Sequence, residues 1–500
     1  MNPAEIDFIE SKFLSPCKIK PEKCSESFVL LIFGGAGDLS RKKLLPALYQ
    51  LFQHKSFKNF SIIAIGRSIR SEKAYRTLIA KAVKKHVGKN YQKSNWDRFA
   101  KHLFYRSYNV KQQSTYDDLC GLITQHCKKN RTKNVIYYLA VQPSLTVPII
   151  QGLSRQHLCR EKQHSKIILE KPFGVDQASA RKLNQKVLRA FDEKQVYRID
   201  HYLGKETVQN ILFFRYANTI FEPIWNRDYI DHVQITVAED VGILERGEFY
   251  EEAGVIRDIV QNHLLQLIAM IAMEPPANFT ANLIRNERVK IFRSIRPITG
   301  NKITQQIVTA QYSSYRREKN VAKNSLVPTY FAGKFYLNNR RWSGVPFYVR
   351  TGKKLAKKST QIIVQFKIPA LKMLGRTCDI MNPNKLIFQI QPQESITMQF
   401  CVKQPGTLNV PQPVLMSFDY AKAFQVDTLP AYNRLLLDCM QGDQSLFSRQ
   451  DEVEAMWKVV DPIIKNLQRK RKISTYTAGS WGPKSAEQLI TKDKRRWINA

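Results

Sequence analysis

The sequence predicts an α/β fold with two domains: an N-terminal doubly wound parallel sheet and a larger C-terminal α+β domain with a mainly antiparallel sheet. Continuous apolar runs of strand length alternate with helix-like segments in the first 200 residues, as expected of strands buried on both faces. After residue 230, candidate strands alternate polar and apolar residues, which is typical of sheets that bury one face. A chain of 500 residues is also too long for one simple core.

The first domain begins with an uninterrupted apolar run at residues 28–33, which predicts a buried strand. Further strands and helices are then expected in alternation, with strands at residues 61–65, 135–140 and 166–169 and helices near residues 71–87, 114–129 and 145–158. This alternation predicts a Rossmann-like sheet. We assign residues 27–200 to this domain, and the polar residues 1–26 to a loose N-terminal arm.

The second domain is assigned to residues 201–500. Its clearest strands are residues 232–237 (HVQITV) and 395–400 (SITMQF), in which polar and apolar side chains alternate. The main helix is expected at residues 253–273, because the Glu-Pro-Pro sequence that follows ends a helix. An antiparallel sheet covered by helices on one side is the predicted architecture.

Composition narrows the classes of function. No stretch reaches the roughly 18 uncharged apolar residues that a membrane helix needs. The N-terminus also lacks a signal pattern, so we expect a cytoplasmic protein without membrane contact. The eight cysteines show no C-x-x-C spacing, which predicts reduced thiols and no metal site.

The net charge of +37 is extreme, and it attracts sugar phosphates, dinucleotides and nucleic acid alike. The basic residues are dispersed in short groups, however, without the interleaved aromatic residues of single-strand binders. This dispersion disfavours nucleic-acid binding and is typical of a solvated surface.

A glycine-rich turn, GGAGDLS (residues 34–40), follows the first strand directly and precedes a helical pattern. Glycines at this turn let the backbone approach a pyrophosphate that is held at the helix N-terminus. The spacing departs from the common G-x-G-x-x-G fingerprint, so a tight structural turn is the alternative interpretation. Its place between strand and helix nevertheless predicts a dinucleotide site that includes Gly34, Gly35 and Gly37.

The ends of two later strands carry basic residues. Arg67 follows the second strand, with no acid before Glu72; an arginine there accepts the 2′-phosphate of NADP, whereas an acid holds the ribose of NAD. NADP is therefore the favoured coenzyme, and a solvated loop arginine is the alternative. Lys171, in the sequence EKPFG (residues 170–174), ends another parallel strand and is expected to point into the ligand crevice.

The segment RIDHYLGK (residues 198–205) precedes an apolar helical run. Lysine, histidine and backbone N–H groups at a helix start favour a bound phosphate, because the helix dipole and the unpaired donors both attract an anion. The segment therefore predicts a phosphate site.

The sequence has nine histidines, and an imidazole is a suitable base for a hydroxyl proton near neutral pH. Six of them lie among polar or basic residues and are expected at the surface: His54, His86, His102, His126, His157 and His164. His232 falls on the polar face of its strand, which leaves His201 and His263. His263 lies in a polar stripe, RDIVQNHLLQ (residues 257–266), of an otherwise apolar helix, and a satisfied core histidine is the alternative.

Together with YLAVQP (residues 138–143) and RTGKKLAKK (residues 350–358), these motifs resemble the glucose-6-phosphate dehydrogenase family over residues 28–485. Departures are modest: Gln142 replaces a proline and Glu248 a small residue. The resemblance implies oxidation of glucose 6-phosphate at C1 to 6-phospho-D-glucono-1,5-lactone, with hydride transfer to NADP, as the first step of the oxidative pentose phosphate pathway. A broader hexose-phosphate dehydrogenase and a dehydrogenase-derived nucleic-acid-binding protein are the alternatives.

The resemblance also implies residue roles. His263 is then the general base and Asp200 its paired carboxylate. The substrate-binding residues are Lys171, His201, Tyr202, Lys205, Glu239, Asp258, Lys353 and Lys358, although a solvated lysine run is the alternative for the last two. The cofactor-binding residues are Gly34, Gly35, Gly37, Asp38, Leu39, Lys43, Arg67 and Lys171. The second domain is expected to bind substrate and to form a homodimer or homotetramer.

Overall fold

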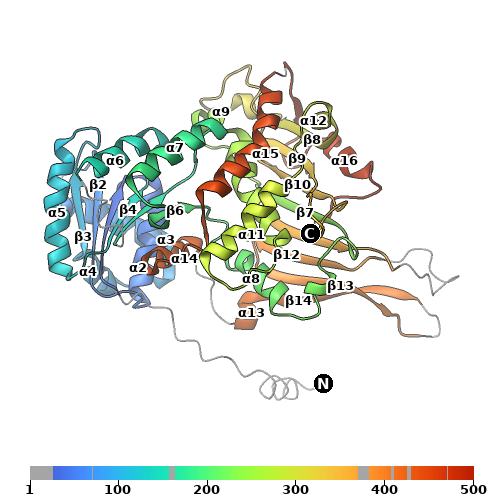
Figure 1. Ribbon diagram of the computed structural model, residues 1–500, viewed down its shortest axis with the longest axis horizontal. Helices are drawn as coiled ribbons and strands as arrows, with labels where there is room; N and C mark the ends of the chain where they lie inside the picture. The colour runs from blue at the N-terminus through green and yellow to red at the C-terminus, as the bar shows by residue number, and fades with distance from the viewer. Residues whose placement is uncertain are drawn as a thin grey trace, which may run out of the picture.

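The computed structural model describes residues 26–69, 71–156, 164–369, 382–406, 410–424, 430–469 and 471–499. Two sheets lie side by side in it, each with its own helices (Figure 1). All predicted site residues fall within these ranges, whereas the predicted N-terminal arm lies outside them except for Glu26.

The first sheet has seven strands in the order β15-β6-β5-β4-β1-β2-β3. Their bounds are β1 (Phe28–Phe33), β2 (Phe60–Gly66), β3 (Leu103–Ser107), β4 (Val135–Leu139), β5 (Ser165–Leu169), β6 (Val196–Ile199) and β15 (Phe447–Ser448). Strands β1 to β6 are parallel and follow the 3-2-1-4-5-6 order of a doubly wound sheet, and β15 adds an antiparallel edge. The predicted Rossmann-like sheet is confirmed.

Helices cover both faces of this sheet. On one face lie α2 (Leu45–Gln53), α3 (Glu72–Val87), α4 (Lys93–Ala100) and α14 (Ala431–Gln441), and on the other α5 (Ser114–Asn130), α6 (Pro143–Arg155) and α7 (Gln177–Ala190). Each face has its own layer of buried apolar side chains, which is why β1 is apolar at every position. The helices predicted near residues 71–87, 114–129 and 145–158 correspond to α3, α5 and α6.

The second sheet has nine strands in the order β14-β13-β12-β11-β7-β10-β9-β8-β16. Their bounds are β7 (Ile230–Ala238), β8 (Ile307–Tyr312), β9 (Tyr330–Phe335), β10 (Phe347–Gly352), β11 (Ser359–Phe366), β12 (Lys385–Gln391), β13 (Ser395–Lys403), β14 (Pro411–Asp419) and β16 (Ser474–Tyr476). Only the β10–β7 and β16–β8 pairs of these strands are parallel, so the predicted mainly antiparallel sheet is confirmed. The two predicted strands are β7 and β13.

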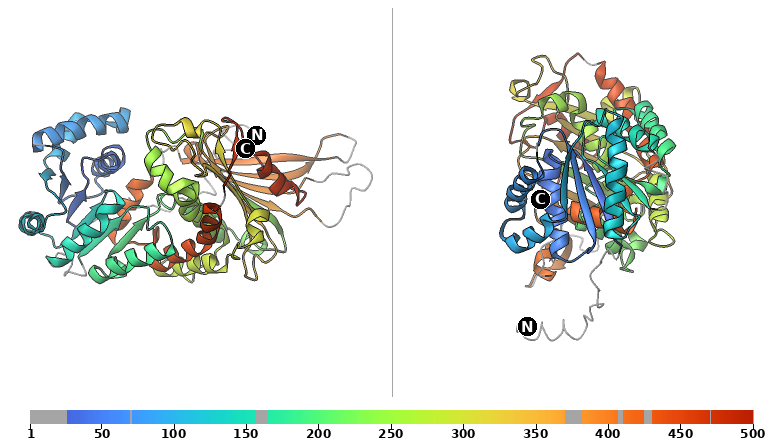
Figure 2. Two further views of the ribbon diagram at one scale, coloured as in Figure 1. Left: turned by 90° about the horizontal axis from the view of Figure 1, so that it is seen from above. Right: turned by 90° about the vertical axis from the view of Figure 1, so that its left-hand side faces the viewer.

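A buried helical rod connects the second sheet to the first. It consists of α9 (Gly247–Val255), the π-helix η5 (Ile256–Leu264) and α10 (Leu265–Ala272), and α11 (Ala281–Ser294) and α15 (Gln450–Gln468) pack against it (Figure 2). The rod begins at Gly247, before the predicted start at residue 253. The backbone of Gly254, at φ +56°, is not helical and interrupts α9 near its end. It is long and apolar enough to span a membrane, but 94% of its apolar window is buried within the protein, as in a core helix.

The remaining helices are short or peripheral. They are α8 (Glu206–Tyr216), α12 (Asn301–Gln306), α13 (Tyr420–Phe424) and α16 (Lys484–Thr491), with single turns η2 (Gly88–Asn90), η3 (Glu193–Gln195), η4 (Glu222–Ile224) and η6 (Tyr315–Arg317). The chain returns to the first sheet late in the sequence, because α14 packs on α2 and β15 pairs with β6. The domain boundary at residue 200 stays a prediction, and the first sheet includes these later residues.

Candidate active site

A cavity of about 930 Å³ lies between the two sheets and is lined from both. Most of the predicted site residues converge on its wall: Leu39, Lys43, Lys171, His201, Tyr202, Lys205, Glu239, Asp258, His263, Lys353 and Lys358. They come from the first sheet, the helical rod and the second sheet, so the cavity depends on how the parts of the chain pack together.

The glycine-rich turn leads into the wall of the cavity: Leu39, near the end of the turn, lines the cavity, whereas Gly34, Gly35 and Gly37 are not among its lining residues. Gly34 adopts φ +82°, and a Cβ atom there would lie 2.2 Å from the carbonyl oxygen of Ala140. A Cβ atom at Gly35 would lie 2.5 Å from the Cβ of Ala64. The buried Ser40 hydroxyl donates to the Gly34 carbonyl at 2.9 Å and closes the turn. The glycines therefore let the turn pack against its neighbours and bring the following helix to the cavity.

The predicted coenzyme residues divide into two groups. Leu39 and Lys43 line the cavity, and Lys43 belongs to the short π-helix η1 (Ser40–Leu44). Asp38 is exposed and instead pairs with Arg41 at 2.6 Å and Lys42 at 2.7 Å. Arg67 is exposed just beyond β2 and is not among the residues that line the cavity. Neither the Asp38 side chain nor the Arg67 side chain therefore lies on the wall of the cavity.

A buried carboxylate–imidazole pair lies at the junction of the two sheets. Asp200 follows β6 directly, His263 lies on η5, and His263 Nδ1 is 2.5 Å from Asp200 Oδ1. The side chains are 4% and 1% exposed. The backbone N–H of Tyr202 also donates to Asp200 Oδ1 at 3.0 Å, and the Tyr202 ring stacks on the imidazole at 4.3 Å. These contacts fix the orientation of the imidazole ring.

The other imidazole nitrogen faces the cavity. Lys171 Nζ lies 2.9 Å from His263 Nε2, so Nε2 acts as the acceptor and Nδ1 carries the proton toward Asp200. Burial raises the pKa of Asp200. Burial, followed by the positive charge of Lys171, lowers the pKa of His263 well below its usual range. The imidazole is therefore neutral near pH 7, which is the form that can accept a proton.

Alternating charges line the wall next to this pair. Lys353 Nζ pairs with the Glu239 carboxylate and lies 3.6 Å from Asp258 Oδ2. Lys171 Nζ donates to the Asp258 carbonyl at 2.8 Å. Burial alone would raise the pKa of Asp258, but Lys171 and Lys353 outweigh it and lower that pKa to about 2. Asp258 is therefore ionised, and the wall offers both donors and acceptors to a polyhydroxyl ligand.

A third group of side chains lies at the start of α8. Lys205 is the N-cap residue of this helix, and its Nζ lies 3.6 Å above the centre of the Tyr202 ring. Burial lowers the pKa of Lys205 to about 7. The His201 ring lies 4.5 Å from the His263 ring, and burial lowers the His201 pKa well below its usual range. An anion at this helix start would favour the protonated forms of both side chains.

Sequence reasoning missed several residues that the structure brings to the cavity. His86, Arg246, Arg257, Gln391, Glu394 and Tyr432 all line it. Two histidines expected at the surface or on a polar strand face are buried: His126 contacts Ser61 Oγ at 3.0 Å, and His232 pairs with Asp231 at 2.6 Å. His126 keeps helical spacing with the buried Leu119 and Ile123, which its polar neighbours in sequence obscured, whereas His232 lies on a polar strand face that tertiary packing buries.

Asp200, His201 and His263 are also close enough together to hold a metal ion. The ammonium group of Lys171 lies on His263 Nε2, however, and a nearby positive charge opposes a bound cation. The expectation of no metal site stays a prediction.

The fold and the cavity define an oxidoreductase that binds a nicotinamide dinucleotide. Family models match both halves: the NAD-binding domain of glucose-6-phosphate dehydrogenase over residues 31–210 and the C-terminal domain of that enzyme over residues 212–498. The chain therefore belongs to the glucose-6-phosphate dehydrogenase family.

Individual relatives are similar to this chain over nearly its whole length. Glucose-6-phosphate 1-dehydrogenase of Aggregatibacter actinomycetemcomitans is 40% identical over 486 residues, 95% of this chain and 97% of the relative. The Bacillus subtilis (strain 168) protein of that name is 37% identical over 488 residues, 94% and 98% of the two chains. A solved glucose-6-phosphate dehydrogenase in complex with its substrate glucose-6-phosphate has a TM-score of 0.88 at 30% identity, covering 96% of this chain and 100% of the other. The Mycobacterium avium enzyme has a TM-score of 0.84 at 32% identity, covering 95% and 98%.

The glycine turn can be tested with Gly34→Ala. A side chain at φ +82° costs about 1–2 kcal/mol in backbone strain before the clash with Ala140 is counted. We expect a lower Tm and weaker dinucleotide binding, measured by calorimetry and fluorescence titration. Gly121→Ala on α5 is the matched control, because no atom lies within 4 Å of its added Cβ. Unchanged dinucleotide affinity in Gly34→Ala would contradict the role of the turn.

Proposed function

We propose that this enzyme oxidises the C1 hydroxyl of D-glucose 6-phosphate to 6-phospho-D-glucono-1,5-lactone and transfers the hydride to NADP. This reaction opens the oxidative pentose phosphate pathway. The observation that carries the proposal is the buried Asp200–His263 pair, whose unprotonated imidazole nitrogen, Nε2, faces a cavity lined by both sheets. The solved relative in complex with its substrate glucose-6-phosphate supports the choice of sugar.

His263 acts as the general base of the proposed reaction. Its Nε2 atom accepts the C1 hydroxyl proton, and Asp200 stabilises the imidazolium that forms. Lys171, which lies 2.9 Å from Nε2, moves to the substrate oxygen and reaches the coenzyme as well. The nicotinamide ring supplies the hydride acceptor when it is bound. Burial of the pair keeps water away and strengthens each electrostatic contact.

The substrate is oriented by the two walls next to the base. Asp258 and Glu239 accept from sugar hydroxyls, and Lys353 holds both carboxylates in place. His201, Tyr202, Lys205 and Lys358 bind the 6-phosphate through charge-assisted hydrogen bonds. These donors all line the same cavity as His263.

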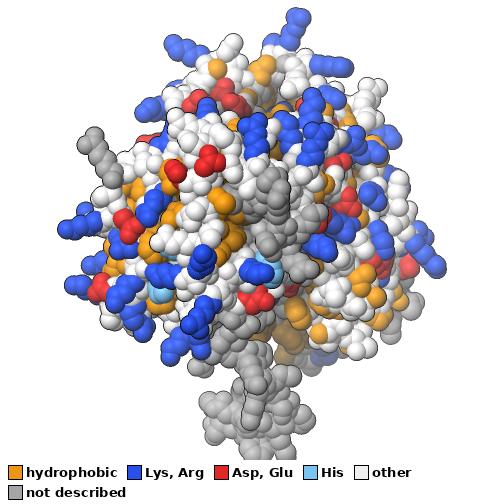
Figure 3. All heavy atoms as spheres, turned by 60° about the vertical axis from the view of Figure 1, so that its left-hand side comes forward, with side chains coloured by type: hydrophobic (Ala, Val, Ile, Leu, Met, Phe, Trp, Pro, Cys, Tyr) orange, Lys and Arg blue, Asp and Glu red, His pale blue; other side chains and the backbone are white. Residues whose placement is uncertain are grey.

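NADP is preferred to NAD in this proposal, because Arg67 follows β2, where the 2′-phosphate of a dinucleotide lies in related folds. Gly34, Gly35, Gly37, Asp38, Leu39 and Lys43 form the rest of the coenzyme site. We also propose a cytoplasmic homodimer or homotetramer. The net charge of +37 favours anionic ligands, and Figure 3 shows Lys and Arg side chains dispersed over one face rather than gathered in a single stripe.

The reaction is tested by following NADPH absorbance with glucose 6-phosphate, mannose 6-phosphate and unphosphorylated glucose as substrates. We expect the highest kcat/KM for glucose 6-phosphate. Comparable kcat/KM values for both sugar phosphates would favour the broader hexose-phosphate dehydrogenase. Equal kcat/KM for glucose and its phosphate would contradict the phosphate site.

The base is tested with His263→Asn. Loss of a general base lowers kcat by roughly 10²–10⁴-fold, whereas a polar side chain of similar size leaves NADP affinity unchanged. Asp200→Asn is expected to lower kcat less, and the two effects should not add in the double variant, because both residues serve one proton transfer. Near wild-type kcat in His263→Asn, together with a much lower Tm, would make His263 a core histidine.

Coenzyme choice is tested with Arg67→Ala. Loss of a charge-assisted contact to the 2′-phosphate should weaken NADP binding by about 1.5–3 kcal/mol and change NAD binding far less. Titration of both coenzymes measures the difference. Arg76→Ala, on α3 of the same domain, serves as a control for general loss of positive charge. If NADP and NAD affinities fall equally, the assignment of Arg67 is wrong.

Phosphate binding should depend on pH through Lys205, whose pKa burial lowers to about 7. Lys205 is protonated below pH 7 and loses its charge as the pH rises, while a bound phosphate raises its pKa. The Kd for glucose 6-phosphate should therefore rise by up to about tenfold per pH unit above pH 7. Calorimetric titration measures it. Lys205→Arg, which stays charged, should remove this dependence; an identical dependence in that variant would refute the assignment.

A further inference from the structure

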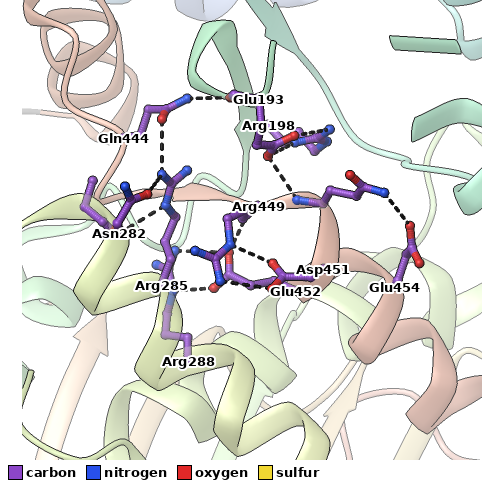
Figure 4. A network of polar contacts seen from close by, with 12 residues as sticks. Glu193, Arg198, Asn282, Arg285, Arg288, Gln444, Arg449, Asp451, Glu452 and Glu454 are labelled. Carbon is purple, nitrogen blue, oxygen red and sulfur yellow. Dashed lines mark hydrogen bonds and ion pairs between the residues drawn. The ribbon is translucent and has the colours of Figure 1, made fainter. Parts of the chain in front are cut away.

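A network of polar side chains, among them Arg198 of β6, lies next to the strand that Asp200 follows (Figure 4). Its centre is the Arg288–Glu452 ion pair between α11 and α15, whose side chains are 1% and 0% exposed. Arg288 Nε lies 2.7 Å from Glu452 Oε1, and its Nη2 lies 3.3 Å from Oε2. A buried ion pair adds little stability relative to apolar side chains of the same volume, so its geometry is better explained by what it holds in place.

The ion pair holds both ends of the short strand β15. Arg288 Nη2 donates to the carbonyl of Phe447 at 2.9 Å. The backbone N–H of Arg449 donates to Glu452 Oε2 at 2.6 Å. Because β15 contains only Phe447 and Ser448, these two bonds fix the strand from either side.

Strand β15 in turn fixes the end of β6. Phe447 pairs with Ile199, and Ser448 pairs with Arg198. Asp200 is the next residue after Ile199, so its backbone position is set by this pairing. Strand β15 is the edge of the sheet on this side, and β6 therefore has β15 as its neighbour there.

Two amide side chains extend the same support. Gln444 Nε2 donates to the carbonyl of Val196 in β6 at 2.9 Å, and its Oε1 accepts from Arg285 Nη2 at 3.1 Å. Gln266 Nε2, on α10, donates to Ser448 Oγ at 3.2 Å. Gln266 lies three residues after His263, so β15 contacts both the strand of Asp200 and the helical rod of His263.

We propose that Arg288 and Glu452 are positioning residues that act through β15 to set Asp200 against His263. Neither residue is among those that line the cavity, so neither touches the substrate or coenzyme. Burial raises the pKa of Asp200, and the charge of Arg288 is among those that oppose this rise, which couples the ion pair to Asp200 electrostatically as well. The inference rests on the proposed function, in which Asp200 and His263 share one proton transfer.

The test is Glu452→Gln, made in the wild type and in an Asp200→Asn background. Displacement of a catalytic group by a fraction of an ångström lowers kcat by roughly 10- to 100-fold. We expect such a loss of kcat in the wild-type background with KM for both substrates within about threefold, since the binding residues are untouched. In the Asp200→Asn background, Glu452→Gln should lower kcat no further.

Asp493→Asn is the control for a general loss of stability. It removes a half-buried ion pair to Lys334 on the second sheet and should leave kcat unchanged. All kcat values are referred to folded enzyme, measured by circular dichroism. If Glu452→Gln does not fold, Ser448→Ala replaces it, because it removes only the bond from Gln266; about a twofold to tenfold loss of kcat is then expected.

Three results would overturn the positioning role: wild-type kcat in the folded variant, an equal further loss of kcat in the Asp200→Asn background, or a rise in KM with kcat unchanged. Failure of the proposed function would look different: the wild-type enzyme would not oxidise glucose 6-phosphate at all. That result would overturn both the proposed function and the positioning role.

Discussion

The contact between Asp200 and His263, at 2.5 Å, is the interaction on which the rest of the site depends. One partner stands at the end of a strand in the first sheet, and the other lies on the π-helical part of the rod that packs on the second sheet. Burial disfavours a charge on either side chain alone, so the pair must be held together by the surrounding backbone. The chain provides this support by returning, through α14 and β15, to the sheet it left about 250 residues earlier.

The charged side chains around this pair set one another's protonation states. Lys171 and Lys353 keep Asp258 ionised, and the charge of Lys171 also disfavours protonation of His263. The imidazole is therefore neutral, and its Nδ1 atom still contacts the Asp200 carboxylate. Lys205, with a pKa lowered to about 7, forms a further cationic position that a phosphate would stabilise. A cavity with a neutral base, the ionised Asp258 and several lysines suits a phosphorylated polyol better than an apolar alcohol.

Much of this arrangement was predictable from the sequence because its signals are local. The apolar run of β1, the glycine turn after it and Lys171 at the end of β5 each follow from neighbouring residues, and the roles given to Asp200 and His263, which remain predictions, came from a resemblance. Strands β3 and β6 were missed because both contain arginine and β6 has only four residues. Nothing local predicts that Phe447 and Ser448 pair with β6, or that the polar face of β7 with His232 is buried, because these outcomes depend on tertiary packing.

The protonation state of His263 tests most directly whether it acts as the base, and ¹⁵N nuclear magnetic resonance of the imidazole nitrogens between pH 5 and 9 measures it. We predict a neutral ring at pH 7, with the proton on Nδ1 toward Asp200 and an unprotonated Nε2 that accepts from Lys171 Nζ on the cavity side. Because burial, followed by the charge of Lys171, lowers the pKa of this histidine, the midpoint of its protonation should lie well below that of an exposed imidazole. An imidazolium with both nitrogens protonated at pH 7 would contradict the role of His263 as the base, since a charged ring cannot accept the hydroxyl proton.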